Sequence, residues 1–188
     1  MKKDFYTIKA KREDLRARSA YKLEDINKKY KLVKSGDNVL DLGCWPGGWL
    51  LITKRIVWDK GYVLGIDEKE IEKVENVDFI KGDVFSDEVF EKIKEKKFDV
   101  VLSDLAPNTS GILDLDNGRS YELSLRALEI AKTVLSKNGN FLCKIFMGKE
   151  FSEFLNEVRK SFEFVKPVKP TASKKESKEI YIVGKRFK

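Results

Sequence analysis

The chain has 188 residues and a formal net charge of +7, with 41% hydrophobic and 37% charged residues. This length and apolar content suit one globular domain with a continuous core, and they argue against disorder along the whole chain. There is no run of roughly 18 apolar residues, so we expect no membrane span, and the charged start does not read as a secretory signal. We predict one cytoplasmic domain over 1–188, with a basic segment and a helix in 1–30 and the core in 31–188.

Cysteine and histidine usage narrows the chemistry. The cysteines are Cys44 and Cys143, and no pair has the Cys-x-x-Cys spacing, so neither a disulfide framework nor a zinc cluster is predicted. Histidine is absent, which removes the commonest general base and the commonest metal ligand. Any proton transfer must therefore use Lys, Asp, Glu, Tyr or Cys, and we expect no bound metal.

Positive charge gathers at the two ends of the chain. Residues 2–18 and 166–178 are rich in Lys and Arg, whereas the middle is mixed, and the sequence pI is near 9.2. A basic surface suits a polyanionic partner, because each neutralised phosphate releases counterions. Abundant Lys and Glu is also typical of genome bias or a hot habitat, so charge alone leaves both interpretations open.

Apolar runs and helical stretches alternate along the chain. A helix is predicted over 19–30, with Ala20, Leu23 and Ile26 on one side. Strands are predicted at 38–43, 62–67, 77–80, 99–104 and 140–145, separated by helices near 48–57, 69–74, 87–96, 118–137 and 148–160. Two strands with no helix between them follow at 162–167 and 179–183. We therefore predict an α/β fold with a mainly parallel, doubly wound, seven-stranded sheet and an antiparallel edge hairpin.

The stretch DLGCWPGGW, residues 41–49, lies where the first predicted strand passes into a helix. Its glycines allow a tight turn and a close approach to a ligand, although such a turn can also be plain strand–helix geometry. The spacing is GxxxGG and not the GxGxxG of dinucleotide sites, and proline removes an amide that a pyrophosphate would use. We expect an adenosine ligand without phosphates, bound by the loop residues Gly43, Trp45, Pro46, Gly47, Gly48 and Trp49.

Two aspartates follow the next predicted strands. Asp67 ends the second strand, where a carboxylate can accept hydrogen bonds from two ribose hydroxyls. Asp83 follows the third strand and is placed to accept from an adenine amino group. An aspartate in a turn is often only solvated. Ligands of such sheets bind at the carboxyl ends of the strands, however, which favours the functional interpretation for both.

A lysine interrupts the apolar strand Phe141-Leu-Cys-Lys-Ile-Phe146. Burying the Lys144 charge is costly unless it is paired or functional. Asp104 ends the preceding strand and is expected beside Lys144 at the same sheet edge. The two residues form either a tolerated salt bridge or part of a catalytic site.

Motifs along the whole chain resemble one family. Besides the glycine loop they are GID ending at Asp67, GDV around Asp83, SDLAPNTSG from Ser103, RSAYKL from Arg18, CKIF around Lys144, and KPTAS and SKEIY near the end. In their order along the chain they resemble the FtsJ/RrmJ-type ribose methyltransferases, the heat-shock rRNA enzymes of bacteria and their archaeal relatives. DLAPN and RSAYKL are the specific segments. The loop reads CWPGGW where many relatives have CAPGGW.

The resemblance implies a Rossmann-like fold that binds S-adenosylmethionine with the glycine loop, Asp67, Asp83 and Asp104. It also implies an active-site tetrad on Lys22, Asp104, Lys144 and Glu179. The expected reaction is methylation of a uridine ribose 2′-hydroxyl in large-subunit (23S) rRNA, within ribosomal particles, by a monomer without a metal. Lys144 is our candidate base, because a protonated hydroxyl is a poor nucleophile. Asp104 would orient it, and Lys22 and Glu179 would hold the ribose.

Basic residues adjoin the tetrad positions at both chain ends, and they predict a positive rim for RNA phosphates. The rim residues are Arg12, Arg16 and Arg18 before Lys22, and Lys166, Lys169, Lys174, Lys175 and Lys178 before Glu179.

Two other functions stay open at this stage, and two more are disfavoured by the sequence. A tRNA 2′-O-methyltransferase would carry the same tetrad, and a non-catalytic ribosome-assembly factor could share the fold. Base or protein methyltransferases commonly have an aromatic residue where this chain has Asp104-Leu-Ala-Pro107, which makes them less suitable. A nicotinamide-dependent oxidoreductase is disfavoured by the glycine spacing.

Overall fold

The computed structural model describes residues 5–13, 15–173 and 177–188, and a seven-stranded sheet is its centre. The strands are β1 (Asn38–Leu42), β2 (Tyr62–Asp67), β3 (Asp78–Lys81), β4 (Phe98–Ser103), β5 (Leu135–Phe146), β6 (Phe162–Val168) and β7 (Glu179–Phe187). Their spatial order is β3-β2-β1-β4-β5-β7-β6. Neighbours from β3 to β5 are parallel, and β7 is antiparallel to both β5 and β6. The predicted mainly parallel sheet with an antiparallel edge hairpin is confirmed.

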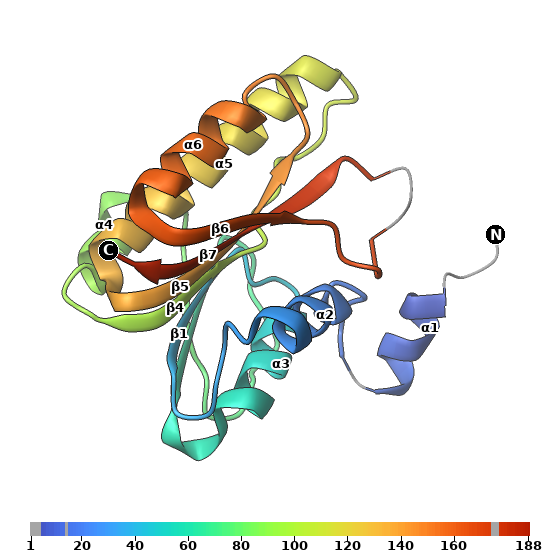
Figure 1. Cartoon of the computed structure of the whole chain (residues 1–188). Helices are drawn as coiled ribbons and strands as arrows, with labels where there is room; N and C mark the ends of the chain where they lie inside the picture. The colour runs from blue at the N-terminus through green and yellow to red at the C-terminus, as the bar shows by residue number, and fades with distance from the viewer. Residues whose placement is uncertain (1–4, 14, 174–176) are drawn as a thin grey trace.

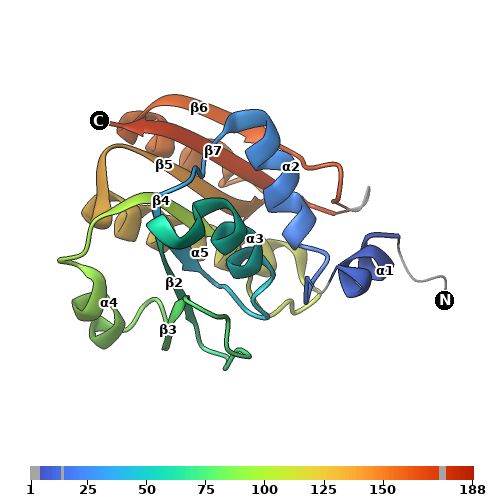
Figure 2. The ribbon, with the colours of Figure 1, turned by 90° about the horizontal axis from the view of Figure 1, so that it is seen from below.

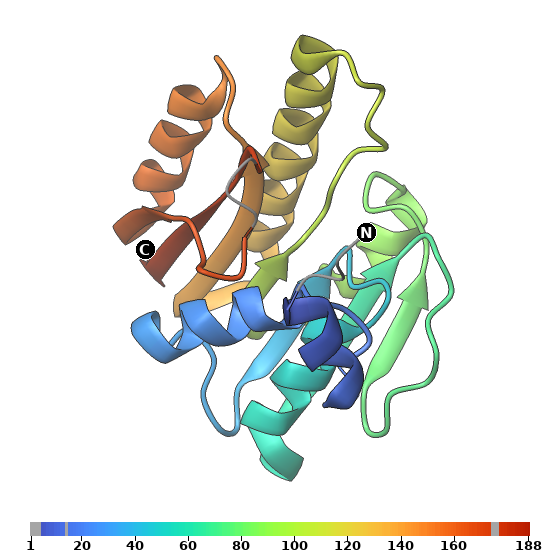
Figure 3. The ribbon, with the colours of Figure 1, turned by 90° about the vertical axis from the view of Figure 1, so that its right-hand side faces the viewer.

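Helices cover both faces of the sheet (Figures 1 and 2). They are α1 (Phe5–Arg12), α2 (Ala20–Tyr30), α3 (Gly48–Val57), α4 (Asp87–Ile93), α5 (Leu113–Val134) and α6 (Phe151–Ser161), with a short 3₁₀ turn at Trp58–Lys60. The blue and teal helices α1, α2 and α3 lie on one side of the sheet in Figure 3, and the yellow and orange helices α5 and α6 lie on the other. This arrangement is the doubly wound one that right-handed crossovers produce.

The central strands are apolar because both of their faces are covered. In β1, Val39 packs with the cluster under α2 and α3, whereas its neighbour Leu40 packs with the cluster under α5 and α6. Leu102 and Val101 divide in the same way along β4. Alternating side chains of each strand thus build two cores, one on each face.

The predicted helix at 69–74 is wrong, because this stretch is irregular in the structure. Six residues are too few for a stable isolated helix. Tertiary contacts favour another path: Val74 is buried, and the carbonyl oxygens of Glu72 and Lys73 accept hydrogen bonds from Arg16.

The long helix near 118–137 is confirmed as an element, but both of its predicted ends are wrong. It begins earlier, at Leu113, where the Asp116 carboxylate accepts hydrogen bonds from the backbone of Ser110 and Gly111. It ends at Val134 because Leu135 already pairs with Phe98 in the sheet.

Candidate functional site

The glycine turn after β1 has a backbone that only glycine fits. Gly43 has φ 75° and Gly47 has φ 103°, both in the left-handed region. A Cβ at Gly43 would lie 2.9 Å from the Leu105 Cα, which is backbone and cannot move aside. The turn after β1 and the segment after β4 therefore approach each other closely, and Gly47 leads directly into α3.

The two predicted aspartates stand at the ends of β2 and β3. Asp67 accepts backbone hydrogen bonds on both oxygens, from Trp45 N at 2.8 Å and from Lys69 N at 2.9 Å. Asp83 Oδ1 accepts from Phe85 N at 2.9 Å. These bonds fix the direction of both carboxylates, and each oxygen keeps a lone pair for a ligand.

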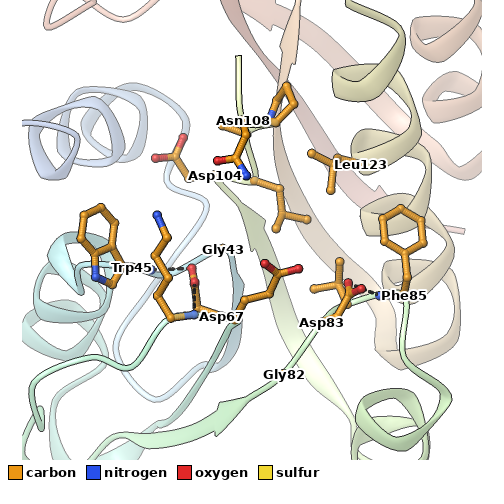
Figure 4. A pocket seen from close by; sticks show the side chains of 15 residues that line it. Gly43, Trp45, Asp67, Gly82, Asp83, Phe85, Asp104, Asn108 and Leu123 are labelled. Atoms are coloured by element: carbon orange, nitrogen blue, oxygen red, sulfur yellow. Dashed lines mark hydrogen bonds between the residues drawn. The ribbon is translucent and has the colours of Figure 1, made fainter. Parts of the chain in front are cut away.

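A pocket of about 390 Å³ opens between the ends of β1 to β4 (Figure 4). This volume lies in the range of small-molecule sites. The pocket is lined by Gly43, Trp45, Asp67, Glu68, Lys69, Gly82, Asp83, Val84, Phe85, Asp104, Leu105, Ala106, Pro107, Asn108 and Leu123. It thus brings together Gly43, Trp45 and the three predicted carboxylates.

The remaining loop residues do not line this pocket. Gly48 and Trp49 are buried at the start of α3, and the Trp49 indole Nε1 donates to the Ser19 carbonyl oxygen at 2.9 Å. Pro46 and Gly47 form the turn between Trp45 and Gly48. Any cofactor role of these four residues stays a prediction from the family resemblance.

The tetrad residues form two close ion pairs beside the pocket. Lys144 Nζ lies 3.0 Å from Asp104 Oδ1 and donates to the Asp104 carbonyl oxygen at 2.7 Å. Lys22 Nζ lies 2.6 Å from Glu179 Oε2. Only 5% of the Lys144 side chain is exposed, so its interactions with Asp104 replace most of its solvation by water.

Tyr181 joins the two ion pairs, and sequence reasoning assigned it no role. Its hydroxyl donates to Asp104 Oδ1 at 2.7 Å, and Lys22 Nζ lies 5.6 Å from its ring centroid. It is also the cross-strand partner of Lys144. One signal was available: Glu179 and Tyr181 are two residues apart on a predicted strand and so share a face.

Burial and charge set the protonation of this cluster. Burial raises the pKa of Glu179, but the ammonium groups of Lys22 and Lys144 outweigh it and leave the pKa below its usual value. Burial and the carboxylates of Asp104 and Glu179 raise the pKa of Tyr181 far above its usual value. Glu179 is therefore an anion, and Tyr181 stays a hydrogen-bond donor.

Asp41 is a second residue that sequence reasoning left unassigned. It is fully buried in β1, and no hydrogen-bond partner within the described part of the chain reaches either carboxylate oxygen. Burial, followed by the charges of Asp104 and Asp67, raises its pKa well above the usual range. A buried carboxyl without a partner favours the neutral acid.

Two of the predicted rim residues point into the protein. Arg16 donates to backbone carbonyls of 46, 72 and 73, and Arg18 Nη2 donates to the Ala172 carbonyl oxygen at 2.6 Å. Arg12, Lys166, Lys169 and Lys178 are exposed. Lys174 and Lys175 lie outside the described residues. Fewer of the predicted rim residues are therefore available to RNA, and Arg16 and Arg18 instead connect separate segments of the chain.

Among the described residues, neither α5 nor any shorter helix has the length and apolar character to cross a membrane. Within the same ranges, no cluster of His, Cys, Asp and Glu side chains is arranged to hold a metal ion. Cys44 and Cys143 are both buried free thiols.

Asp41→Asn should change how stability depends on pH. Above about pH 4 the unfolded chain releases the Asp41 proton that the folded chain keeps, so folded stability falls as pH rises toward the raised pKa. The asparagine variant should lack this loss, which amounts to at most about 1.4 kcal/mol per pH unit. Urea unfolding at pH 5 and pH 8 without ligand measures it. The exposed Asp59→Asn variant is the control, and parallel pH profiles for wild type and Asp41→Asn would contradict the assignment.

Comparison with known proteins gives the chain its relatives. The profile of the FtsJ-like methyltransferase family matches residues 15–187. Ribosomal RNA large subunit methyltransferase E of Methanocaldococcus jannaschii is 45% identical over 99% of this chain and 79% of its own length. The protein of that name from Syntrophobacter fumaroxidans is 45% identical, over 99% of this chain and 96% of its own length.

Solved structures agree with this relationship. A Plasmodium falciparum protein described as a ribosomal RNA methyltransferase has a TM-score of 0.80 and 30% identity, covering 92% of this chain and 98% of its own. Aeropyrum pernix fibrillarin, crystallised with natively bound S-adenosyl-L-methionine, has a TM-score of 0.60 and 16% identity, covering 90% and 75%, and shares the fold. Because the family profile and relatives at this identity span nearly all of its length, the chain belongs to the FtsJ-like methyltransferase family.

Proposed function

We propose that the protein transfers a methyl group from S-adenosylmethionine to a ribose 2′-hydroxyl of ribosomal RNA, specifically of a uridine in the large-subunit RNA. The observation that carries the proposal is the double position of Asp104. Asp104 lines the cofactor-sized pocket, and its carboxylate pairs with the buried Lys144 at 3.0 Å. A methyl donor and a proton acceptor would therefore meet at one residue. The names of the relatives supply the RNA class.

The pocket suits the proposed cofactor. Asp67, with both oxygens already oriented, would accept from the ribose hydroxyls, and Asp83 from the adenine amino group. The exposed face of Phe85 lines the same end and offers a planar surface to a planar base. When bound, the cofactor supplies an electrophilic methyl group on a positively charged sulfur, and the carboxylate-rich wall matches that charge.

Lys144 is the proposed proton acceptor. In its neutral form, Nζ would take the proton of the ribose hydroxyl as that oxygen bonds to the methyl carbon and the carbon–sulfur bond breaks, and the ammonium that results would pair with Asp104. The two bonds that Lys144 makes to Asp104 fix where Nζ points. Lys22 and the anionic Glu179, which form the second ion pair, would hold the acceptor ribose. No proton needs to pass through a metal in this scheme.

The proposed substrate is a large ribosomal subunit, approached by a monomer in the cytoplasm. Exposed Arg12, Lys166 and Lys178 would contact phosphates, which position RNA without reading its sequence. A 2′-hydroxyl acceptor would restrict the reaction to RNA, because DNA has no such group.

One experiment tests the function directly. The protein is incubated with methyl-labelled S-adenosylmethionine and large ribosomal subunits that lack the modification, and the RNA is then hydrolysed with alkali. Alkaline cleavage needs a free 2′-hydroxyl, so we expect the label in alkali-resistant dinucleotides containing uridine. Parallel reactions with tRNA and with free rRNA test the substrate class. Label in mononucleotides would indicate base methylation and contradict the proposal.

Lys144→Ala and Lys144→Arg should both lose single-turnover activity, by roughly 10²- to 10⁴-fold, which is the usual contribution of a general base. Arginine should not restore the rate, because a guanidinium does not deprotonate in this pH range. Lys149→Ala is the matched control, since 75% of that side chain is exposed. An arginine variant with wild-type turnover would contradict a lysine base.

A further inference from the structure

The segment between α1 and α2 lies directly against the glycine turn, and Arg16 makes the contact. Its Nη1 donates to the Glu72 carbonyl oxygen at 2.7 Å and to the Pro46 carbonyl oxygen at 3.4 Å, while Nη2 donates to the Lys73 carbonyl oxygen at 3.1 Å. Its Nε also lies 3.7 Å from the Glu72 carboxylate, and 17% of the side chain is exposed. One guanidinium thus joins three parts of the chain.

Arg16 and Ala17 pack closely against Gly47 and Gly48 at the start of α3. A Cβ at Gly47 would lie 2.7 Å from Arg16 Nη1, and a Cβ at Gly48 would lie 3.4 Å from the Ala17 Cβ. Arg16 itself has φ 39°, a strained conformation for a side chain with a Cβ. The surrounding contacts must hold it there, since a strained residue persists only when its neighbours fix it.

We propose that Arg16 is a positioning residue of the cofactor site. It fixes the turn whose Trp45 amide orients Asp67, and it fixes residues 72–73, which follow Asp67 and Lys69 along the chain. The segment that carries Arg16 leads into α2 and so to Lys22. The cofactor pocket and the Lys22 half of the tetrad are therefore connected through one side chain. The identity of the cofactor rests on the proposed function.

The geometry requires arginine rather than any cation. A guanidinium presents donors in a fixed planar fork and can serve several carbonyls at once, whereas a lysine ammonium is a single point at the end of a flexible chain. The Nη1 and Nη2 donors of Arg16 bond to backbone oxygens of the protein. Arg12, in contrast, is exposed and suited to a phosphate.

The coupling works in both directions. A ligand that binds the pocket and favours the ordered turn must also favour the ordered segment before α2, because linkage between two sites is reciprocal. Residues 5–19 should therefore become more protected when the cofactor binds. Leu15 and Ala10 are buried in the core cluster on this side, so loosening of the segment would expose apolar surface.

The test compares Arg16→Ala and Arg16→Lys with Arg159→Ala, an exposed arginine on α6. Calorimetric titration with S-adenosylmethionine, without RNA, should give cofactor affinity about tenfold weaker for both Arg16 variants, the size of loss expected for charged hydrogen bonds. Added guanidinium ion should partly restore Arg16→Ala, and Arg159→Ala should bind as wild type. In hydrogen exchange, cofactor should slow amides in 5–19 of the wild type, and this protection should be lost in Arg16→Ala.

RNA binding at several salt concentrations separates the alternative role. Arg12→Ala should lower the salt slope by about one phosphate contact, whereas Arg16→Lys and Arg16→Ala should leave it unchanged. A reduced slope for Arg16→Ala together with unchanged cofactor affinity would overturn the proposal and return Arg16 to the RNA rim. If the alanine variant fails to fold, Arg16→Lys carries the same readouts. Neither measurement needs methyl transfer. A chain that binds cofactor but forms no alkali-resistant product would therefore contradict the proposed function and leave the Arg16 proposal standing.

Discussion

The ion pair between Lys144 and Asp104 is the constraint around which the site is built. Both groups are largely removed from water, and a buried pair is stable only when its remaining hydrogen-bonding positions are filled. Here Lys144 also donates to the Asp104 carbonyl oxygen, and the Tyr181 hydroxyl donates to one oxygen of the Asp104 carboxylate. Tyr181 must stay protonated to do this, and burial beside two carboxylates keeps it so.

The sheet topology makes this pair possible. Parallel order places the ends of β1, β2, β3 and β4 at one edge, where the carboxylates of the pocket gather. β7 enters antiparallel between β5 and β6, so its first residues reach the edge at which β5 ends. Glu179 therefore stands opposite Phe146, and Tyr181 opposite Lys144. A parallel strand in that position would have presented its last residues instead.

Much of this arrangement could be predicted from sequence, and the rest depends on tertiary contacts. Apolar runs predicted the strands, and the position of polar residues at strand ends predicted Asp67, Asp83, Asp104 and Lys144 as site residues. The stretch 69–74 has a helical pattern but follows the hydrogen bonds of Arg16 instead. Tyr181 reads as an ordinary strand residue until its partner Asp104 is known. Basic character near Lys22 suggested an RNA surface, yet charge along a sequence does not reveal which way a side chain turns.

The direction of β7 also determines where a label can be attached away from the pocket. Its nine residues carry the chain roughly 27 Å from the tetrad edge, and Lys188 N then bonds to the Ser161 carbonyl oxygen at the opposite edge. The first helix, α1, in contrast lies beside α2 (Figure 1). A fluorophore, a purification tag or a surface tether attached at Lys188 would therefore lie away from the pocket and leave it accessible, whereas the same group on α1 would lie next to the segment that carries Arg16.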